Sequence, residues 1–453
     1  MEALRTNEIA LALGIDHPLG DGMVTNICTD SREATEGSLF VAIPGERVDG
    51  HDYVEKALSQ GAALALVERD GNYPPDRTLL VDNTVKAMLR LAAWYRDRVP
   101  AKVVAITGSV GKTTTKDMIA AVLSAGFRTI KTIGNQNNEI GTPRTILSID
   151  RDTEAAVIEM GMSGFGEIQE LALAAKPQIG VITNIGVSHM EHLGSRENIL
   201  KAKLELAQCL PDGATLFLCA DNDLLERVEI PRLHVLFYGV DNEEADIRGI
   251  ITHSTPVRTD FTICYNGQEW QANIPATGKH LVQNALAAFG IGLSLGMEPE
   301  TAIAALSDYR PSGMRQNVVD KGGITIVEDC YNASPDSVSA ALRTLGEFPC
   351  TGKRYAVLSD MLELGALSHE GHRSCGELAA SCADTLLLWG SFAEDYAAGA
   401  RAAGIQRVQI LPDKESIANL LAKELVSGDV VWFKASRGMK LEESIEALYK
   451  QIT

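Results

Sequence analysis

The chain has 453 residues, a net charge of −19 at pH 7, and 45% hydrophobic and 22% charged residues, which predicts an ordinary globular protein of about three domains. The acidic balance argues against a nucleic-acid or acidic-membrane surface, which needs a basic footprint, so local lysines, arginines or Mg²⁺ must hold any anionic substrate. The eight cysteines form no Cys-x-x-Cys pair, so we expect no structural zinc. Because neither a signal pattern nor a bilayer-length apolar run is present, we expect no membrane insertion and a cytoplasmic location.

The first domain is predicted over residues 1–84 as a small α/β unit. Short apolar strands are expected at residues 37–43, 63–67 and 78–81, and one helix is expected at residues 52–59. Two polar loops between these elements, at 29–32 and 45–51, contain arginine. They are either surface turns or part of a binding site for a polar or anionic ligand, and the residues alone leave both interpretations open. A helix at 83–99 leads to the next domain.

The second domain is predicted over residues 85–313 and opens with a phosphate loop. An apolar run, a small-residue turn and Lys-Thr-Thr at 112–114 form the pattern of a buried strand, a phosphate loop and a helix. Lys112 can reach the outer phosphates of a nucleotide, and Thr113 or Thr114 can supply a hydroxyl to Mg²⁺. An ordinary glycine-rich turn would explain the glycines but not the Lys-Thr-Thr at the helix start.

Alternating apolar strands and helical segments follow this loop and predict a mostly parallel sheet with helices on both faces. The strands are expected at residues 155–160, 179–183 and 214–218. Near residues 247–275 the pattern changes to short alternating strands with a Tyr-Asn-Gly turn at 265–267, which predicts an antiparallel annex. Two helices, at 280–295 and 301–306, lead to a linker at 310–313.

The third domain is predicted over residues 314–453 as a second doubly wound, Rossmann-like unit. Amphipathic helices such as 337–345 alternate with five apolar strands, which are expected at residues 324–327, 355–358, 385–389, 408–410 and 429–433. No Gly-x-Gly-x-x-Gly follows the first of these strands, so a dinucleotide site there is not supported. The expected fold class is therefore α/β in three domains, with the P-loop ATPase-like sheet in the middle.

Four further features lie where open α/β sheets bind ligands, near the carboxyl ends of strands. Glu159 ends an apolar strand and is either a metal ligand or a solvated capping carboxylate. His189 could ligate a metal or orient a phosphate, although a lone histidine is more often structural, and His192 has the same chemistry. Lys203 lies on a helix with no distinguishing spacing. The amide-rich stretch at 134–141 is either a turn or a donor–acceptor surface for sugar and peptide groups.

Several stretches together share the motifs of one enzyme family. They are Asp-Ser-Arg at 30–32, Gly45 with Asp-Gly-His at 49–51, Thr-Gly-Ser-Val-Gly-Lys-Thr-Thr at 107–114, Gly-Asn-Gln-Asn-Asn-Glu-Ile-Gly at 134–141, Glu-Met-Gly-Met-Ser-Gly-Phe-Gly-Glu-Ile at 159–168, Thr-Asn-Ile-Gly at 183–186 with His189, Asn-Ala-Leu-Ala-Ala at 284–288, Asp-Cys-Tyr-Asn-Ala-Ser-Pro at 329–335, Asp-Met-Leu-Glu-Leu-Gly at 360–365 and Lys-Ala-Ser-Arg-Gly at 434–438. On these stretches the chain resembles, essentially end to end, the Mur ligases, the ATP-dependent amide-forming enzymes of peptidoglycan precursor synthesis. The stretches at 137–141, 331–335 and 360–365 resemble those of the branch of this family that adds D-alanyl-D-alanine to UDP-N-acetylmuramoyl-tripeptide.

The resemblance implies roles for individual residues. ATP would be held by Gly108, Ser109, Val110, Gly111, Lys112, Thr113, Thr114, Asn284, Arg315 and Asp329. Glu159 and His189 match the family's metal-site residues beside Thr113, and Lys203 matches a lysine that is carbamylated in relatives, which makes it an anionic ligand for a second Mg²⁺. The same four side chains, Lys112, Glu159, His189 and Lys203, are the catalytic candidates. The substrates would be bound by Ser31, Arg32, Glu46 and Arg47 (uridine diphosphate), Asn137 and Asn138 (muramoyl-peptide), and Asn332, Lys434 and Ser436.

The activity that this resemblance implies is amide formation at the cost of ATP. The γ-phosphate would pass to the tripeptide's terminal carboxylate, the D-alanyl-D-alanine amine would attack the acyl phosphate through a tetrahedral intermediate, and ADP and phosphate would leave. Closure of the three domains would exclude water from the acyl phosphate. We expect a monomer acting on these small molecules, and the third residue of the acceptor peptide, lysine or diaminopimelate, is not readable from the sequence.

Two alternatives belong to different classes of protein. The nearer one is a sibling Mur ligase, or a folate-polyglutamate or cyanophycin-type relative, that adds a single amino acid. The Asp-Asn-Pro-Arg stretch of the diaminopimelate-adding branch is absent, which disfavours that sibling. The other alternative is a non-catalytic P-loop regulator, against which Glu159, His189 and Lys203 argue together, because a binder needs no two-metal site.

Overall fold

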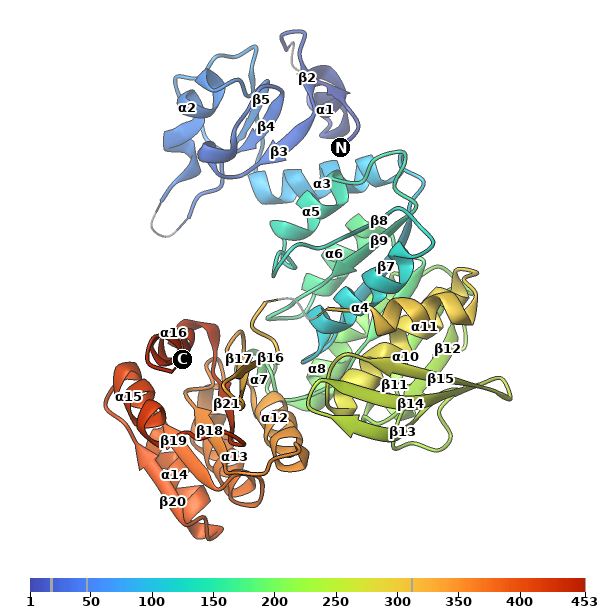
Figure 1. The fold of residues 1–453 in the computed structure, drawn as a ribbon. Coiled ribbons are helices and arrows are strands. Elements are labelled where there is room, and N and C mark those ends of the chain that lie inside the picture. Colours follow the sequence, from blue (N-terminus) through green and yellow to red (C-terminus); the bar gives the residue numbers. More distant parts are fainter. Residues whose placement is uncertain (17–18, 46–47, 311–312, 453) are drawn as a thin grey trace.

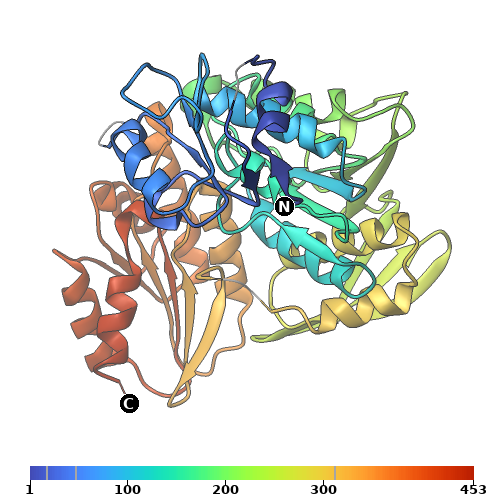
Figure 2. The same cartoon turned by 90° about the horizontal axis from the view of Figure 1, so that it is seen from above.

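The computed structural model describes residues 1–16, 19–45, 48–310 and 313–452. The ribbon forms three lobes in chain order, with the N-terminal sheet in blue, a central sheet in cyan to yellow and a C-terminal sheet in orange to red (Figure 1). Seen from above, the C-terminal sheet lies beside the central one (Figure 2). None of the helices in the described ranges is both long and apolar enough to cross a bilayer.

The N-terminal lobe is a four-stranded parallel sheet in the order β3-β4-β5-β6, preceded by a small antiparallel pair. Its elements are β1 (Leu4–Arg5), α1 (Thr6–Ala12), β2 (Met23–Val24), β3 (Asn26–Cys28), η1 (Ser31–Glu33), β4 (Ser38–Val41), η2 (Gly50–Tyr53), α2 (Val54–Ser59), β5 (Leu64–Val67) and β6 (Thr78–Leu80). The three predicted strands and the predicted helix are present. The strand β3 was not predicted, because it is only three residues long and half-buried.

The helix α3 (Thr84–Arg96) joins the first two lobes. It begins where predicted, because the Asn83 side chain accepts a hydrogen bond from the Lys86 N–H and caps its first turn. Its buried side packs on α5 (Gly141–Leu147) and α6 (Glu167–Ala175) of the central lobe as well as on β4. A further link between the lobes is the 2.9 Å ion pair of Arg144 with Glu33.

The central lobe contains one nine-stranded sheet in the order β15-β14-β13-β12-β11-β10-β7-β9-β8. Its strands are β7 (Lys102–Thr107), β8 (Thr129–Lys131), β9 (Ala155–Glu159), β10 (Ile179–Ile182), β11 (Thr215–Cys219), β12 (His234–Gly239), β13 (Ile247–Thr255), β14 (Arg258–Tyr265) and β15 (Gln268–Ile274). The strands from β8 to β13 pair in parallel, whereas β13, β14 and β15 pair antiparallel. The predicted annex is therefore a continuation of the same sheet, and Asn266 and Gly267 take the positive φ angles that a tight hairpin requires.

Helices cover this sheet and separate its parallel strands. They are α4 (Lys112–Ser124), α5 (Gly141–Leu147), α6 (Glu167–Ala175), α7 (Met190–Leu193), α8 (Arg196–Lys203), α9 (Glu205–Gln208), η3 (Leu225–Arg227), α10 (Lys279–Ser294) and α11 (Pro299–Ser307). The strand β7 is paired on both sides and buried from Val103 onward, which explains its nearly continuous apolar sequence. Its carboxyl end carries the phosphate loop.

The C-terminal lobe is a six-stranded sheet in the order β16-β17-β21-β18-β19-β20, parallel except for the edge strand β16. Its elements are β16 (Asn317–Lys321), β17 (Ile324–Asp329), α12 (Pro335–Glu347), β18 (Arg354–Leu358), η4 (Gly365–Leu367), α13 (Ser368–Cys382), β19 (Thr385–Leu388), α14 (Ala393–Ala402), β20 (Arg407–Ile410), α15 (Lys414–Glu424), β21 (Val430–Lys434), η5 (Arg437–Met439) and α16 (Glu442–Tyr449). Neighbouring residues of β18 alternate between two apolar cores, Tyr355 and Val357 in one, Ala356 and Leu358 in the other. The sheet is therefore covered on both faces, and the predicted α/β fold class is confirmed.

Candidate active site

The phosphate loop, residues 108–111, connects β7 to α4 and needs glycine at both of its ends. Gly108 has φ of 152°, and a Cβ there would lie 1.9 Å from the Thr183 hydroxyl oxygen. Gly111 has φ of 82° at the N-cap of α4, a left-handed conformation that side chains with a Cβ rarely adopt. The loop therefore brings its backbone against the end of β10 and turns the first N–H groups of α4 toward the cavity, as an anion site requires.

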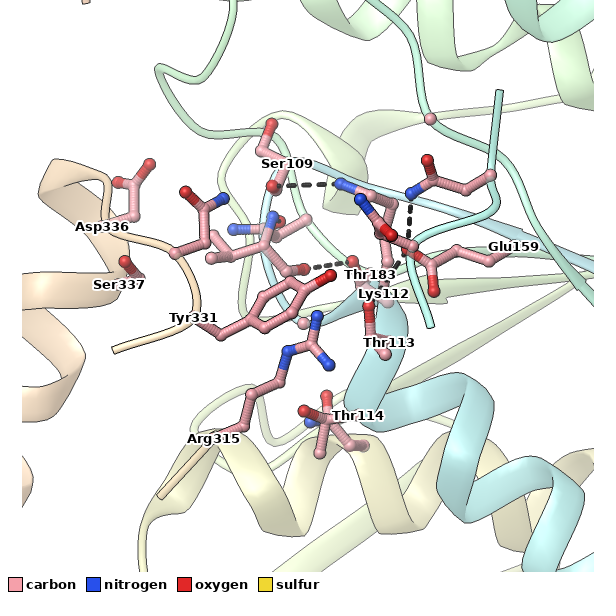
Figure 3. Close-up of a pocket in the computed structure, with 18 of the residues that line it drawn as sticks. Ser109, Lys112, Thr113, Thr114, Glu159, Thr183, Arg315, Tyr331, Asp336 and Ser337 are labelled. Carbon is pink, nitrogen blue, oxygen red and sulfur yellow. Dashed lines mark hydrogen bonds between the residues drawn. The ribbon is translucent and has the colours of Figure 1, made fainter. Parts of the chain in front are cut away.

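Lys112 lies over this loop (Figure 3). Its ammonium donates to the carbonyl oxygens of Gly108 at 2.6 Å and Ser109 at 3.3 Å. Burial lowers the pKa of Lys112, and the Glu159 carboxylate partly opposes that shift. Asn184, just after β10, steadies the loop by accepting a hydrogen bond from the Val110 N–H at 2.8 Å. A phosphate group would offer this half-buried ammonium an anionic partner in place of two neutral carbonyls.

Glu159 ends β9 and is buried beside the start of α4. One of its carboxylate oxygens, Oε1, accepts hydrogen bonds from the Thr113 hydroxyl at 3.1 Å and the Asn137 amide at 2.8 Å. The other oxygen, Oε2, has no hydrogen-bond partner among the described residues and lies 3.4 Å from the Lys116 ammonium. A buried carboxylate oxygen with spare lone pairs next to a threonine hydroxyl fits an oxygen-seeking cation such as Mg²⁺.

His189 and Lys203 lie close enough to Lys112 for the three groups to influence one another. His189 has φ of 65° at the start of α7. Burial and the ammonium groups of Lys112 and Lys203 lower its pKa to about 4, which keeps the imidazole neutral and able to coordinate a metal. Lys203 ends α8 and is 1% exposed, and burial together with Lys112 holds its pKa well below the usual range.

No set of three or more His, Cys, Asp or Glu side chains in the described ranges is arranged to hold a metal ion. The combination of Glu159, Thr113 and His189 still fits Mg²⁺, because that ion keeps several waters and substrate phosphate oxygens and seldom sits in an all-protein cage. The three side chains come from the ends of β9, α4 and the segment after β10, at one edge of the sheet.

The opposite wall comes from the C-terminal sheet (Figure 3). The Arg315 guanidinium stacks 3.7 Å over the Tyr331 ring. Behind it the Lys434 ammonium makes a buried ion pair with Asp329 at 3.0 Å and donates to the Asn332 carbonyl at 2.8 Å. Burial raises the pKa of Asp329, and Lys434 opposes that rise. The two walls enclose a cavity of about 930 Å³.

Most of the predicted site residues line this one cavity. They are Ser109, Val110, Gly111, Lys112, Thr113, Thr114, Asn137, Asn138, Glu159, His189, Asn284, Arg315, Asp329, Asn332 and Lys434. Asn284 comes from α10, and its side-chain oxygen would lie 3.5 Å from a Cβ placed on Gly111, so it borders the phosphate loop.

Other predicted residues do not line the cavity. The Gly108 carbonyl accepts a hydrogen bond from Lys112, and Lys203 is buried close enough to Lys112 for that charge to lower its pKa. The Ser436 hydroxyl is buried between the Leu362 N–H and the Ala333 carbonyl. Ser31 and Arg32 belong to η1 of the N-terminal lobe, where Arg32 pairs with its neighbour Asp30. Glu46 and Arg47 lie outside the described residues.

The structure adds residues that sequence reasoning had not assigned. Tyr331, Asn184, Glu363 and Arg437 also border the cavity, and all four lay inside the family-like stretches. Lys116 gave no such signal, since a lysine in a helix is usually solvated. It lies three residues after Thr113, on the same buried face of α4, and this spacing is the one clue that could have identified it.

The chain matches three family descriptions in succession: "Mur ligase family, catalytic domain" over residues 23–102, "Mur ligase middle domain" over residues 106–292 and "Mur ligase, glutamate ligase domain" over residues 314–437. It is 40% identical over 431 residues to the UDP-N-acetylmuramoyl-tripeptide–D-alanyl-D-alanine ligase of Bacillus subtilis, an alignment that spans 94% of this chain and 93% of the relative. The Escherichia coli protein of the same name is 34% identical, with 94% of each chain covered.

Solved structures give the same picture at the level of the fold. A crystal structure of MurF from Acinetobacter baumannii superposes with a TM-score of 0.91 at 27% identity and covers 99% of both chains. MurF ligase from Thermotoga maritima in complex with ADP superposes with a TM-score of 0.86 at 31% identity, over 94% of this chain and 98% of that one. With three domain matches in order and relatives aligned over nearly their whole length, the chain belongs to the Mur ligase family.

Proposed function

We propose that the protein is an ATP-dependent ligase that joins D-alanyl-D-alanine to the tripeptide carboxylate of UDP-N-acetylmuramoyl-tripeptide and releases ADP and phosphate. The observation that carries this proposal is the shared cavity, in which a phosphate loop on one sheet faces residues of a second sheet and lies beside Glu159, His189 and Lys203. The names of the relatives from Bacillus subtilis and Escherichia coli supply the two substrates.

The nucleotide would bind along the phosphate loop, with its phosphates at the N-terminus of α4. Lys112 would exchange its contacts to the loop carbonyls for the outer phosphates, while Asn284 and Arg315 would contact the rest of the nucleotide from either side. Thr113, Glu159 and His189 would hold Mg²⁺, whose charge offsets that of the phosphates when it is bound. The ADP in the Thermotoga maritima structure supports ATP as the phosphate donor.

Lys203 fits the carbamate that the family resemblance implies. Its amine is buried beside the Lys112 ammonium, so the neutral form is favoured, and a neutral amine can attack CO₂ and lose a proton to give an anionic carbamate. The carbamate would place a negative group near the Lys112 ammonium, an attraction that the neutral amine does not provide. The carbamate would also provide the oxygen atoms that a second Mg²⁺ needs.

Positioning and charge neutralisation are the main tasks of the protein in phosphoryl transfer to a carboxylate. Lys112 would neutralise the γ-phosphate so that a second anion, the tripeptide carboxylate, can approach it. The C-terminal wall, with Arg315 stacked on Tyr331, would cover the reacting groups and exclude water from the acyl phosphate. The amine of the dipeptide would then attack the acyl carbon and displace phosphate.

In this proposal each lobe binds a different substrate. Residues 1–84 would bind the uridine diphosphate through Ser31, Arg32, Glu46 and Arg47, residues 85–313 would bind ATP, and residues 314–453 would bring the dipeptide and close over the nucleotide. Asn137 and Asn138 would contact the muramoyl-peptide, and Asn332, Lys434 and Ser436 would shape the dipeptide side. We propose a monomer that acts on these small molecules in the cytoplasm.

Phosphate release from ATP tests this function directly. The purified protein is assayed with UDP-muramoyl-tripeptides ending in lysine or diaminopimelate, each with D-alanyl-D-alanine, with single amino acids or without an amine. We expect sustained release only with a tripeptide and the dipeptide together. Release with a single amino acid would point to a sibling ligase instead. ATP binding without phosphate release from any of the muramoyl-peptides would point to a non-catalytic regulator.

A further inference from the structure

The segment 360–365, which follows β18, is fixed to its surroundings at three consecutive residues. The Asp360 carboxylate accepts hydrogen bonds from the N–H groups of Ser391 at 2.8 Å and Phe392 at 3.1 Å. The Met361 N–H donates to His372 Nε2 at 2.9 Å, and the Leu362 N–H donates to the Ser436 hydroxyl at 2.9 Å. The next residue, Glu363, is therefore held in place by a rigid support.

Glu363 extends from this segment, and its carboxylate lines the cavity. Its backbone is left-handed, with φ of 64°, and its side chain is 78% exposed, with Oε2 4.0 Å from His189 Nδ1. It belongs to the C-terminal lobe and lines the same cavity as the phosphate loop. The amine attacks one face of the planar acyl group, so it needs a binding site that borders the cavity in which the acyl phosphate forms, and the C-terminal wall provides one.

Most other carboxylates of the cavity already have partners. Glu159 is held by Thr113 and Asn137, Asp329 is paired with Lys434, Asp336 accepts from the Val187 N–H, and Glu167 accepts from the Ser163 N–H. Glu139 and Glu170 also line the cavity, but they belong to the central lobe, on the side of the phosphate loop. Glu363 is thus the available carboxylate on the C-terminal wall among the described residues.

Arg437 lies on the neighbouring loop and lines the same cavity. The strands β18 and β21 are adjacent, with Leu358 opposite Lys434, so the segments that follow them start side by side. The hydrogen bond from the Leu362 N–H to Ser436 ties the two segments together. The Arg437 side chain is 56% exposed and pairs with Glu442, and since a guanidinium has five N–H donors it can bind a second carboxylate.

We propose that these two loops form the seat of the incoming dipeptide, with Glu363 binding its ammonium group and Arg437 its carboxylate. A free dipeptide is a zwitterion, and two side chains of opposite charge on two linked loops of one wall match its two ends. This inference rests on the proposed ligase function and deepens it, because it names the residues that select a dipeptide with both ends free.

The first test compares steady-state kinetics of the wild type and Glu363→Gln. The loss of one charge-assisted hydrogen bond should raise the KM for D-alanyl-D-alanine roughly 10- to 100-fold, while the KM values for ATP and for the UDP-muramoyl-tripeptide stay within about twofold. Glu370→Gln is the matched control, since Glu370 is an exposed glutamate of the same lobe that does not line the cavity. An unchanged KM for the dipeptide in Glu363→Gln would overturn the inference.

The second test uses a dipeptide whose carboxylate is replaced by a carboxamide. The wild type should use D-alanyl-D-alanine amide roughly tenfold less well than the acid, and Arg437→Gln should show little difference between the two. A preference for the acid that persists in Arg437→Gln would remove Arg437 from the seat.

A partial reaction separates this inference from the proposed function. Without dipeptide, hydroxylamine converts an acyl phosphate to a hydroxamate, which can be measured in the presence of ATP and the UDP-muramoyl-tripeptide. If the wild type gives none, the proposed function fails and the inference with it. Equal hydroxamate from the wild type and Glu363→Gln, with a raised dipeptide KM only in the variant, supports the inference. A lower yield in Glu363→Gln with a changed Mg²⁺ requirement would assign Glu363 to the activation step and overturn it.

Discussion

The two walls of the cavity are both built from the carboxyl ends of parallel strands, yet they differ in how their charged groups are paired. On the central wall, Glu159 Oε2 has no hydrogen bond and Lys112 donates only to carbonyls of its own loop. On the C-terminal wall, Lys434 is paired with Asp329 and Asp360 is held by two backbone N–H groups. The central wall is thus the incomplete one for its charged groups, although the Lys116 ammonium lies 3.4 Å from Glu159 Oε2. The C-terminal wall leaves only a neutral acceptor, Gln316 Oε1, without a partner among the described residues that line the cavity.

This difference teaches how the two sheets divide the work. Buried polar groups without partners cost stability and persist where a ligand supplies the missing interaction. We therefore expect the central wall to carry the chemistry. Paired buried groups fix loop positions instead, so the C-terminal wall serves as a rigid support that presents Glu363, Arg437 and Arg315 to the cavity.

The largest expected effect comes from Lys203 on the incomplete wall. Lys203→Ala should lower kcat by roughly a thousandfold or more, because both the amine and the carbamate that it could carry are lost. Added short carboxylates such as acetate should restore part of the activity by occupying the vacated space as an anionic oxygen ligand. Lys201→Ala, which removes an exposed lysine from the same helix, is the control and should be close to wild type. Near-normal turnover of Lys203→Ala would show that the central wall does not need this residue.

Lys112 tests whether an unpaired buried charge serves function rather than stability. Lys112→Met should lower phosphate release roughly 100- to 1000-fold, as expected for the loss of one electrostatic contact to the reacting phosphate. The melting temperature without nucleotide should stay the same or rise slightly, since a desolvated ammonium that lacks an ion pair is removed. A clear drop in melting temperature would mean that the loop needs Lys112 for folding, and the contrast between the walls would weaken.

Lys434 should behave in the opposite way. Lys434→Met leaves Asp329 buried without its cation, so the free energy of unfolding should fall by about 3 kcal/mol. Chemical denaturation followed by tryptophan fluorescence can report this loss, because Trp432 lies in the same strand. Lys423→Met, at an exposed site on α15, is the matched control. If Lys434→Met lost activity while keeping full stability, the C-terminal wall would share the role of the central one.

The sequence predicted the fold better than the state of individual charges. The strand periodicity identified every strand of the two main sheets that is long and apolar, but it missed β8, β12 and β16. The short strand β8 and the edge strand β16 are each covered on only part of their surface, and β12 is only partly buried, so their patterns are weak. Glu159 was identifiable because a carboxylate at the end of an apolar strand is unusual. Lys203 was not identifiable from spacing, and Lys116 had only its spacing from Thr113 as a clue, because the burial of both lysines depends on how α4 and α8 pack in three dimensions.

The smallest expected effect concerns the pH dependence of stability and His189. Because the folded protein holds the pKa of His189 at about 4, the unfolded chain, with an ordinary histidine pKa near 6.5, binds more protons between those values. Stability should therefore fall as the pH drops from 6.5 toward 4, and His189 should contribute about 2 kcal/mol of that fall by pH 5. Melting curves at pH 7 and pH 5 should show a smaller decrease for His189→Asn than for the wild type, whereas His192→Asn, at an exposed neighbour, should leave it unchanged. An equal decrease in all three proteins would mean that His189 is already solvated in the folded protein and that the central wall shields its charged groups from water less than the lowered pKa of His189 indicates.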